Sequence, residues 1–235
     1  MQLATLPSTL PAVAGYSMAV CFQPESQTGG DTYDLAEVKD RLLIVMADAT
    51  GHGIAPALSV TQMHAMLRMA FRLGASLETA FTEVNDQLTA TLADGRFVTA
   101  FIGLLDPATH QLRFLSGGQG PILHYRAALQ RCESYRATSF PMGAMPIRTL
   151  RPAIELPFEP GDRLVLLSDG VYEYEATDGT AFGVARVEAL LQEQQASPVS
   201  ALPDLLLTAL RGFAGTAPQL DDITMVFVQR DPPPA

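Results

Sequence analysis

The chain has 235 residues, of which 48% are hydrophobic and 17% are charged, and this balance excludes a disordered chain. Its 15 basic and 25 acidic residues give a net charge of −10, which argues against a nucleic-acid partner or a basic protein of the membrane surface. No apolar run approaches the roughly 18 residues that span a bilayer, so we expect a cytoplasmic protein without a membrane segment. Two cysteines are too few for a disulfide framework.

Strands are predicted where short apolar or alternating runs lie between turn residues. In chain order they cover residues 17–22, 33–38, 41–47, 98–105, 111–116, 122–125, 163–168 and 223–229. Several connections are short, such as the turn at residues 106–109, and short connections predict antiparallel pairing.

Helical periodicity predicts four helices, at about residues 55–73, 77–92, 184–194 and 201–213. Ser76 is the expected N-cap of the second helix, and Pro203 fits the first turn of the fourth. The first helix carries an apolar stripe formed by Leu58, Ala65, Met66, Met69, Ala70 and Leu73. We expect Met66 and Met69 to pack against the sheet, although a Met-rich face could instead bind a regulatory protein or form a homodimer.

Groups of antiparallel strands separated by helix pairs predict an α+β fold with sheets inside and helices outside. We find no linker and no internal repeat, so one domain is the simpler interpretation. We expect residues 1–14 to be an uncharged leader, residues 15–229 to be the domain and residues 230–235 to be a Pro-rich tail.

Aspartates recur where predicted strands begin or end. Asp48 and Asp169 each follow a buried run, Asp31 precedes one, and the pair Asp221-Asp222 opens the last strand. If such strand ends converge, the carboxylates repel one another and need a counter-charge. Oxygen ligands of this kind select a hard cation such as Mg²⁺ or Mn²⁺. A single Asp-Gly pair is usually only a turn or a helix cap, but four such positions favour a metal site.

Five motifs in register carry a resemblance to a known family. They are Gly29-Gly30-Asp31 with Asp34, Ala47-Asp48 with Gly51-His52-Gly53, Phe97-Val98-Thr99-Ala100, Leu167-Ser168-Asp169-Gly170-Val171, and Asp221-Asp222 with Thr224. This order resembles that of the metal-dependent, protein phosphatase 2C-like serine/threonine phosphatases, above all the bacterial branch typified by the stage II sporulation (SpoIIE) phosphatase. The likeness covers about residues 15–229.

The resemblance implies a four-layer αββα sandwich, with two antiparallel sheets flanked by helix pairs, and a centre with two Mn²⁺ or Mg²⁺ ions. Asp48 matches the bridging aspartate, and the carbonyl of Ala49 matches the ligand beside it. Asp31 matches a ligand of one metal, and Asp169 and Asp221 match ligands of the other. Asp222 stays an alternative to Asp221.

The implied reaction is hydrolysis of phosphoserine or phosphothreonine by a metal-activated water, with Asp48 and Asp169 in the catalytic centre. In this branch, the implied substrate is a phosphorylated protein that resembles an anti-sigma factor antagonist. His52 is a candidate general acid, and a local hydrogen bond in its Gly-rich turn is an equally good interpretation. The role of Asp34 is open, because it could simply fix its strand.

Residues 23–29 contain no arginine, unlike the corresponding segment of many eukaryotic relatives, so we expect the substrate phosphate to rest on the metals. Two other functions are open. One is a binding module that keeps the fold without turnover, which the complete set of acidic positions disfavours. The other is a metal hydrolase acting on a different phosphate ester.

Overall fold

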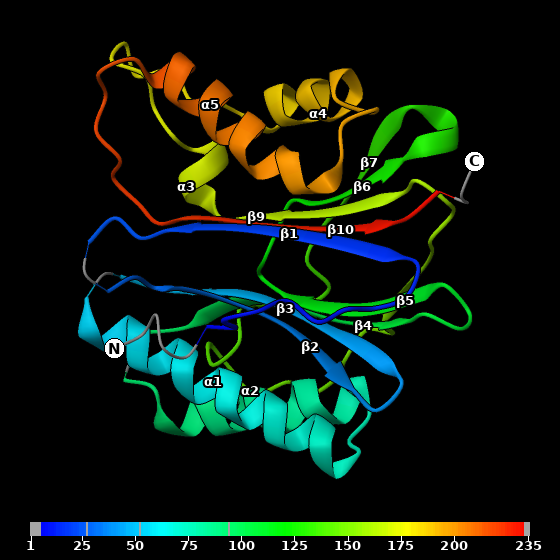
Figure 1. The fold of residues 1–235 in the computed structure, drawn as a ribbon. Helices are drawn as coiled ribbons and strands as arrows, with labels where there is room; N and C mark the ends of the chain where they lie inside the picture. Colours follow the sequence, from blue (N-terminus) through cyan, green and yellow to red (C-terminus); the bar gives the residue numbers. More distant parts are fainter. Residues whose placement is uncertain (1–5, 27, 52, 94, 233–235) are drawn as a thin grey trace. The chain divides into compact units, whose positions relative to one another are not determined.

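The protein forms two compact units, each assembled from separate stretches of the chain (Figure 1). The structure, a computed structural model, describes residues 6–26, 28–51, 53–93 and 95–232. The first unit draws its described residues from 1–13, 27–120 and 136–157, and the second from 14–26, 121–135 and 158–235. None of the helices in these ranges is both long and apolar enough to cross a membrane.

The first unit is a five-stranded antiparallel sheet covered on one face by two helices. Its strands are hydrogen-bonded in the order β2 (Asp31–Val38), β3 (Arg41–Ala49), β4 (Val98–Asp106), β5 (Gln111–Gly117) and β8 (Ile154–Pro157). The helices are α1 (Ile54–Leu73) and α2 (Leu77–Thr91), which lie side by side across the sheet.

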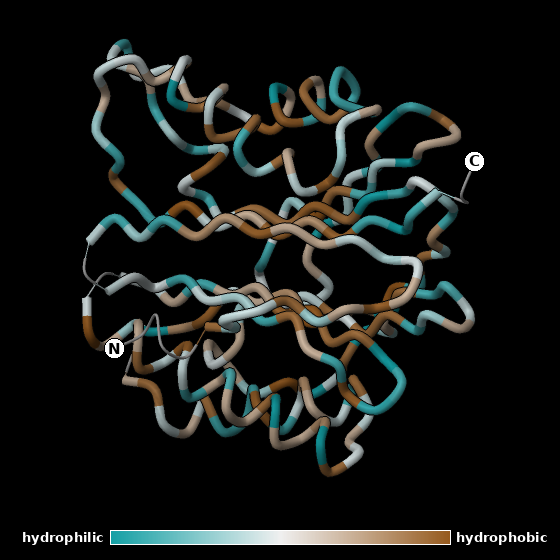
Figure 2. The backbone as a smooth tube through the Cα atoms, viewed as in Figure 1, coloured by the Kyte–Doolittle hydropathy of each residue, from teal (hydrophilic) through white to brown (hydrophobic). Residues whose placement is uncertain are grey.

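Strand β3 sends alternate side chains to opposite faces of its sheet. The odd-numbered ones, such as Leu43, Val45 and Ala47, join the buried cluster that includes residues of both helices. The even-numbered Ile44 and Met46 are also buried, so β3 is apolar on both faces. Figure 2 shows hydrophobic colouring along the strands of the sheets. The two apolar faces explain why the sequence shows a continuous apolar run here and no alternation.

Helix α1 follows the predicted bounds closely, but only part of its predicted apolar stripe packs against the core. The residues it buries are Pro56, Ala57, Ser59, Val60, Met63, Leu67 and Phe71. Met69 is exposed, so the expectation that it packs against the sheet fails, whereas Met66 is partly buried against the core. Helix α1 is apolar on two faces, and periodicity alone could not tell which face meets the sheet.

Helix α2 confirms the predicted periodicity and cap. Ser76 precedes its first turn, and the backbone N–H of Thr79 donates a 3.1 Å hydrogen bond to Ser76 Oγ. Its apolar face is buried, including Leu77, Phe81 and Leu88.

The second unit is also a five-stranded antiparallel sheet, in the order β1 (Tyr16–Gln23), β10 (Ile223–Arg230), β9 (Arg163–Leu167), β6 (Ile122–Arg126) and β7 (Arg131–Tyr135). A short helix, α3 (Asp169–Tyr172), follows β9, while α4 (Val184–Glu193) and α5 (Leu202–Ala214) cover one face of the sheet. Pro203 lies at the start of α5, as predicted.

The α+β class and the two antiparallel sheets with their helix pairs are therefore confirmed. Strands β7 and β8 were not predicted. Both lie at the edge of a sheet, where only part of the strand is buried, so neither shows a clean apolar pattern.

Candidate functional site

In the first unit, two of the predicted aspartates form a pair across neighbouring strands. Asp31 opens β2 and Asp48 lies near the end of β3, and the two residues are directly opposite each other in the ladder. Opposite side chains share one face of a sheet, with Cβ atoms about 5 Å apart. Because Ala47 and Ala49 face the helices, both carboxylates lie on the face away from α1 and α2. Two like charges in this position are unfavourable without a cation.

Gly30 allows a third oxygen to join this pair. A Cβ atom at Gly30 would lie 2.7 Å from the Ala49 carbonyl oxygen and 2.7 Å from Asp48 Oδ1, so a larger residue is excluded. The backbone N–H of Ala49 donates a 3.1 Å hydrogen bond to the Gly30 carbonyl, which fixes this close approach. The carboxylate of Asp48 and the carbonyl of Ala49 therefore converge beside Gly30.

The segment around Phe97 and Thr99 is hydrogen-bonded to the end of β3 and to the residue that follows it. The backbone N–H of Thr50 donates to the Phe97 carbonyl at 3.1 Å, and the N–H of Phe97 donates to Thr50 Oγ1 at 3.2 Å. Thr99, opposite Asp48 on β4, donates to the Asp48 carbonyl at 3.4 Å. This is a structural role for the Phe97–Ala100 motif.

In the second unit, Asp169 lies at the start of α3, directly after strand β9. The Ser168 hydroxyl donates to the Asp222 carbonyl at 2.9 Å and accepts from the N–H of Thr224 at 2.9 Å. Gly170 lies so close to the Asp222 carbonyl that a Cβ atom there would overlap it. The turn carrying Asp169 is thereby fixed against the start of β10.

The two aspartates at the start of β10 have different surroundings. Asp221 is exposed and lines a cavity of about 210 Å³, together with Asp169. Asp222 is buried, does not line this cavity, and accepts a 2.8 Å hydrogen bond from the backbone N–H of Glu25. Asp222 therefore links β10 to the segment that follows β1.

Several carboxylates in and around this cavity raise one another's pKa. The pKa of Asp169 is raised mainly by burial and further by the charges of Glu173 and Asp222. The pKa of Asp221 is raised mainly because its carboxylate is partly desolvated in the cavity, and further by the charges of Asp169, Asp222 and Glu25. Among the described residues, the cavity is also lined by Glu175 and by no basic residue. Such a site favours a cation over an anion.

The residues present thus fit divalent cations in chemistry, with two predicted aspartates in each unit. Each unit contributes only a few of these oxygen donors. Across the described ranges, no three or more His, Cys, Asp or Glu residues lie together in a group that could hold a metal ion. His52, the candidate general acid, lies outside the residues that the structure describes.

The sequence alone does not show what Asp34 does, whereas the structure shows that it has a structural role. Asp34 lies three residues after Asp31 on β2, so its side chain points to the opposite face, toward helix α1. Its buried carboxylate accepts hydrogen bonds from Nε and Nη2 of Arg68, and His64 Nε2 lies 2.8 Å from its Oδ2. Asp34 therefore joins α1 to the strand that carries Asp31.

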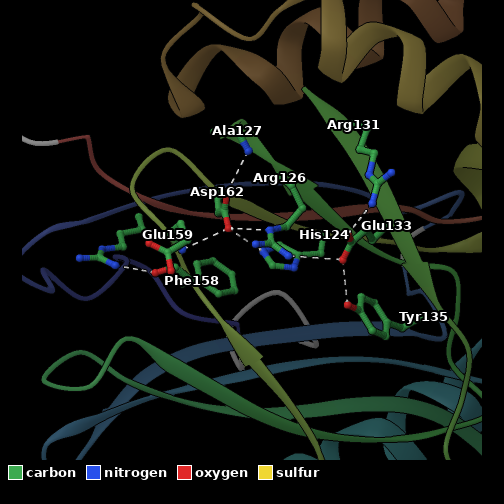
Figure 3. Close-up of polar contacts among 10 residues, drawn as sticks. His124, Arg126, Ala127, Arg131, Glu133, Tyr135, Phe158, Glu159 and Asp162 are labelled. Atoms are coloured by element: carbon green, nitrogen blue, oxygen red, sulfur yellow. Dashed lines mark hydrogen bonds and ion pairs between the residues drawn. The ribbon is translucent and has the colours of Figure 1, made fainter. Parts of the chain in front are cut away.

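A second buried charge cluster was also missed (Figure 3). His124 and Asp162 are fully buried, with His124 Nε2 3.2 Å from Asp162 Oδ2, and Arg126 Nε lies 3.2 Å from the same oxygen. The backbone N–H groups of Ala127 and Glu159 also donate to this carboxylate. No sequence motif marks this cluster, because His124 and Asp162 are 38 positions apart.

Comparison with known proteins identifies the family. Residues 39–231 match the family model described as Stage II sporulation protein E (SpoIIE). Phosphoserine phosphatase RsbU of Bacillus subtilis (strain 168) is 23% identical over 179 residues, which are 76% of this chain and 53% of the relative. Phosphoserine phosphatase RsbP of the same organism is 23% identical over 212 residues, 88% of this chain and 50% of the relative. The chain thus spans about half the length of these relatives.

Among solved structures, the SiaA-PP2C domain of Pseudomonas aeruginosa shares the fold, with a TM-score of 0.83 and 24% identity over 98% of this chain and 93% of that one. The family model covers most of the chain and includes the motifs of Asp48, Asp169 and Asp221. The chain therefore belongs to the stage II sporulation protein E (SpoIIE) family.

Proposed function

We propose that this protein is a metal-dependent protein serine/threonine phosphatase that hydrolyses phosphoserine or phosphothreonine in the cytoplasm. The observation that carries the proposal is the placement of acidic residues at strand ends: a facing pair in the first unit, and two aspartates lining one cavity in the second. Membership of the SpoIIE family and the names of RsbU and RsbP support a phosphatase.

In this proposal, Asp31, Asp48 and the Ala49 carbonyl hold metal in the first unit, and Asp169 and Asp221 hold it in the second. When bound, two Mn²⁺ or Mg²⁺ ions would supply the positive charge that polarises a phosphate ester and acidifies water. Asp48 and Asp169 are the proposed catalytic carboxylates, and the role of His52 as a general acid stays a prediction.

The surrounding residues keep these groups in place. Gly30 leaves room for the oxygens of Asp48 and Ala49, and Gly170 permits close packing of the Asp169 turn on β10. Asp222, the second aspartate of the pair before β10, already accepts a hydrogen bond from the backbone N–H of Glu25. This contact supports Asp221 as the metal ligand of the pair.

A thiol nucleophile has no support in the described structure. Burial raises the pKa of Cys132 to about 12, with a further contribution from the charge of Glu188. Burial and the charge of Asp204 raise the pKa of Cys21, although Arg211 opposes them. Both thiols are thus poor sources of thiolate at neutral pH. This agrees with the proposed reaction, in which water is the nucleophile and no thiolate is needed.

The substrate that we propose is a phosphorylated regulatory protein resembling an anti-sigma factor antagonist. The second candidate function is a phosphatase-like binding module with weak or absent turnover. The acidic residues favour the enzyme, because a module without turnover has no need of neighbouring carboxylates that raise one another's pKa, as Asp169 and Asp221 do.

The test is release of phosphate from a phosphoserine protein by the 235-residue chain, with chelator and then with excess Mn²⁺ or Mg²⁺. We expect activity to vanish with chelator and return with metal, and Asp48→Asn to lower it at least about a hundredfold. The matched control is Asp40→Asn, an exposed aspartate in the turn between β2 and β3.

The thermal melting curve distinguishes loss of metal from loss of the fold. In chelator, Asp48→Asn should melt no lower than the unaltered chain, because it removes one of two facing like charges. Full turnover in chelator, or near-normal activity of Asp48→Asn, would refute the metal-dependent mechanism. Metal binding without turnover on any phosphoserine or phosphothreonine protein would favour the binding module.

A further inference from the structure

The loop between β7 and β8, residues 136–153, contains a groove with apolar walls. The groove has a volume of about 450 Å³, and the side chains that line it include Phe140, Pro141, Met145, Pro146, Ile147 and Arg148. We call it the Phe140 groove. Phe140 is 65% exposed and Met145 is 47% exposed. Single exposed apolar side chains are common on proteins, but several gathered around one concavity mark an interaction site.

Hydrogen bonds on two sides hold the backbone of this groove. Asn85, a buried residue of α2, accepts a 3.1 Å hydrogen bond from the backbone N–H of Gly143, and its Nδ2 donates a 3.0 Å bond to the Met145 carbonyl. On the side of the sheet, Met142 and Val98 exchange two backbone hydrogen bonds of 2.8 and 2.9 Å. The loop is thus fixed between helix and sheet. A ligand that binds there needs little ordering of the protein, which favours binding.

The Phe140 groove lies at the same end of its sheet as the pair of Asp31 and Asp48. Val98 of β4 is opposite Ala49 of β3, and on its other side it is bridged to Met142. Neighbouring strands are about 4.8 Å apart, so the backbones of Ala49 and Met142 are about 10 Å apart. An extended peptide advances about 3.3 Å per residue, so about five or six residues connect the aspartate pair to the groove.

The charge of the loop is opposite to that of the chain as a whole. Residues 136–153 contain Arg136, Arg148 and Arg151 and no acidic residue, although the net charge of the chain is −10. All three arginines are exposed, and within the described residues none of them forms an ion pair. Among the described residues that line the groove, Arg148 is basic and none is acidic. The loop therefore attracts a negatively charged ligand.

We propose that the Phe140 groove docks a segment of the phosphoprotein substrate in which a large apolar side chain lies among acidic residues. This side chain fills the groove beside Phe140 and Met145, and Arg148 pairs with an acidic neighbour. The segment lies about five or six residues from the phosphoserine or phosphothreonine. Docking at this distance selects one substrate among phosphoproteins that all present the same phosphate group. This inference rests on the proposed phosphatase function and states what distinguishes its substrate.

The first experiment compares two synthetic phosphoserine peptides as substrates of the 235-residue chain with Mn²⁺. The anchor peptide carries Glu-Leu-Glu about six residues from the phosphoserine on each side, and the plain peptide carries Gln-Ser-Gln there. We expect kcat/KM to be at least about tenfold higher for the anchor peptide, mainly through a lower KM. In Phe140→Ser and in Arg148→Glu, this ratio should fall toward one. Added salt should also lower it, because it screens the arginines.

Leu129→Ser and Arg72→Glu are the matched controls. Leu129 is an exposed leucine of the second unit, and Arg72 is an exposed arginine in the last turn of α1. Both variants should keep the ratio of the unaltered chain, and circular dichroism melting checks that all four variants are folded. If the unaltered chain hydrolyses both peptides equally well, the docking site is wrong and the phosphatase function stands. A ratio that persists in both groove variants would overturn the docking site as well.

The second experiment tests binding without turnover. An unphosphorylated anchor peptide carries the photoreactive residue p-benzoylphenylalanine in place of leucine, and it is irradiated with the chain in chelator. Mass spectrometry should map the crosslinks to residues 139–149, and their yield should fall in Arg148→Glu but not in Arg72→Glu. Crosslinks scattered over other elements would overturn the proposal. Crosslinks in the groove without hydrolysis of either peptide would refute the phosphatase function and still support the groove as a peptide-binding site.

Discussion

At the scale of single residues, the buried carboxylate of Asp162 shows how a charge is kept in a core. Burial by itself would raise its pKa, but contacts with His124 and the N–H groups of Ala127 and Glu159 outweigh burial, and the pKa of Asp162 is lowered. A lowered pKa in the folded state means that the ionised form stabilises the fold. The stabilisation is complete above the unfolded pKa of about 4 and is lost as pH falls through the lower, folded value.

Asp162→Asn should therefore lower the free energy of unfolding at pH 7 by about 2 kcal/mol, because it leaves His124 and Arg126 facing a neutral group. Urea unfolding from pH 7 down to pH 3 is the measurement. The difference from the unaltered chain should stay constant to about pH 4 and shrink below it. Glu83→Gln, on the exposed face of α2, is the control and should change little. Equal stability at pH 7, or a difference that grows in acid, would contradict this role.

At the scale of elements, the sequence predicted eight strands and four helices close to their observed positions, because each has a clear apolar period or run. It did not predict which face of α1 is buried, since both faces carry apolar residues. A polar contact also joins this helix to the sheet: Asp34 of β2 contacts Arg68 and His64 of α1. Such a contact depends on side chains 30 and 34 positions apart, which no local pattern encodes.

The contact between Asp34 and Arg68 should be measurable as a coupling between strand and helix. Because Asp34 is buried and accepts two hydrogen bonds from Arg68, replacing either residue should destabilise the fold. In a double-mutant cycle of Asp34→Ala and Arg68→Ala, we expect an interaction energy of about 1–3 kcal/mol by thermal or urea unfolding. A matched pair on the surface, Arg113→Ala with Glu155→Ala, should give much less. Strictly additive losses for Asp34 and Arg68 would show that the contact does not hold α1 in place.

At the scale of the whole molecule, each unit carries one pair of the predicted metal-binding aspartates. The motifs around them could be recognised from sequence because glycines and strand ends fix their spacing: Gly30 next to Asp31, and Gly170 next to Asp169. The cavity lining could not be predicted, since Glu173 and Glu175 join Asp221 only through the fold of the chain. Metal binding by each pair can therefore be tested in its own unit.

Metal binding stabilises a folded protein by an amount that grows with the logarithm of its affinity, so the rise in melting temperature with Mn²⁺ reports on the aspartates directly. We expect Asp48→Asn in the first unit and Asp169→Asn in the second each to remove part of this rise. The double variant should lose most of it, because a proposed metal ligand is then missing from both units. Asp222→Asn is the control that should keep the rise, since its carboxylate accepts from the N–H of Glu25 and does not line the cavity. A full rise in melting temperature in the double variant would contradict metal binding by these aspartates.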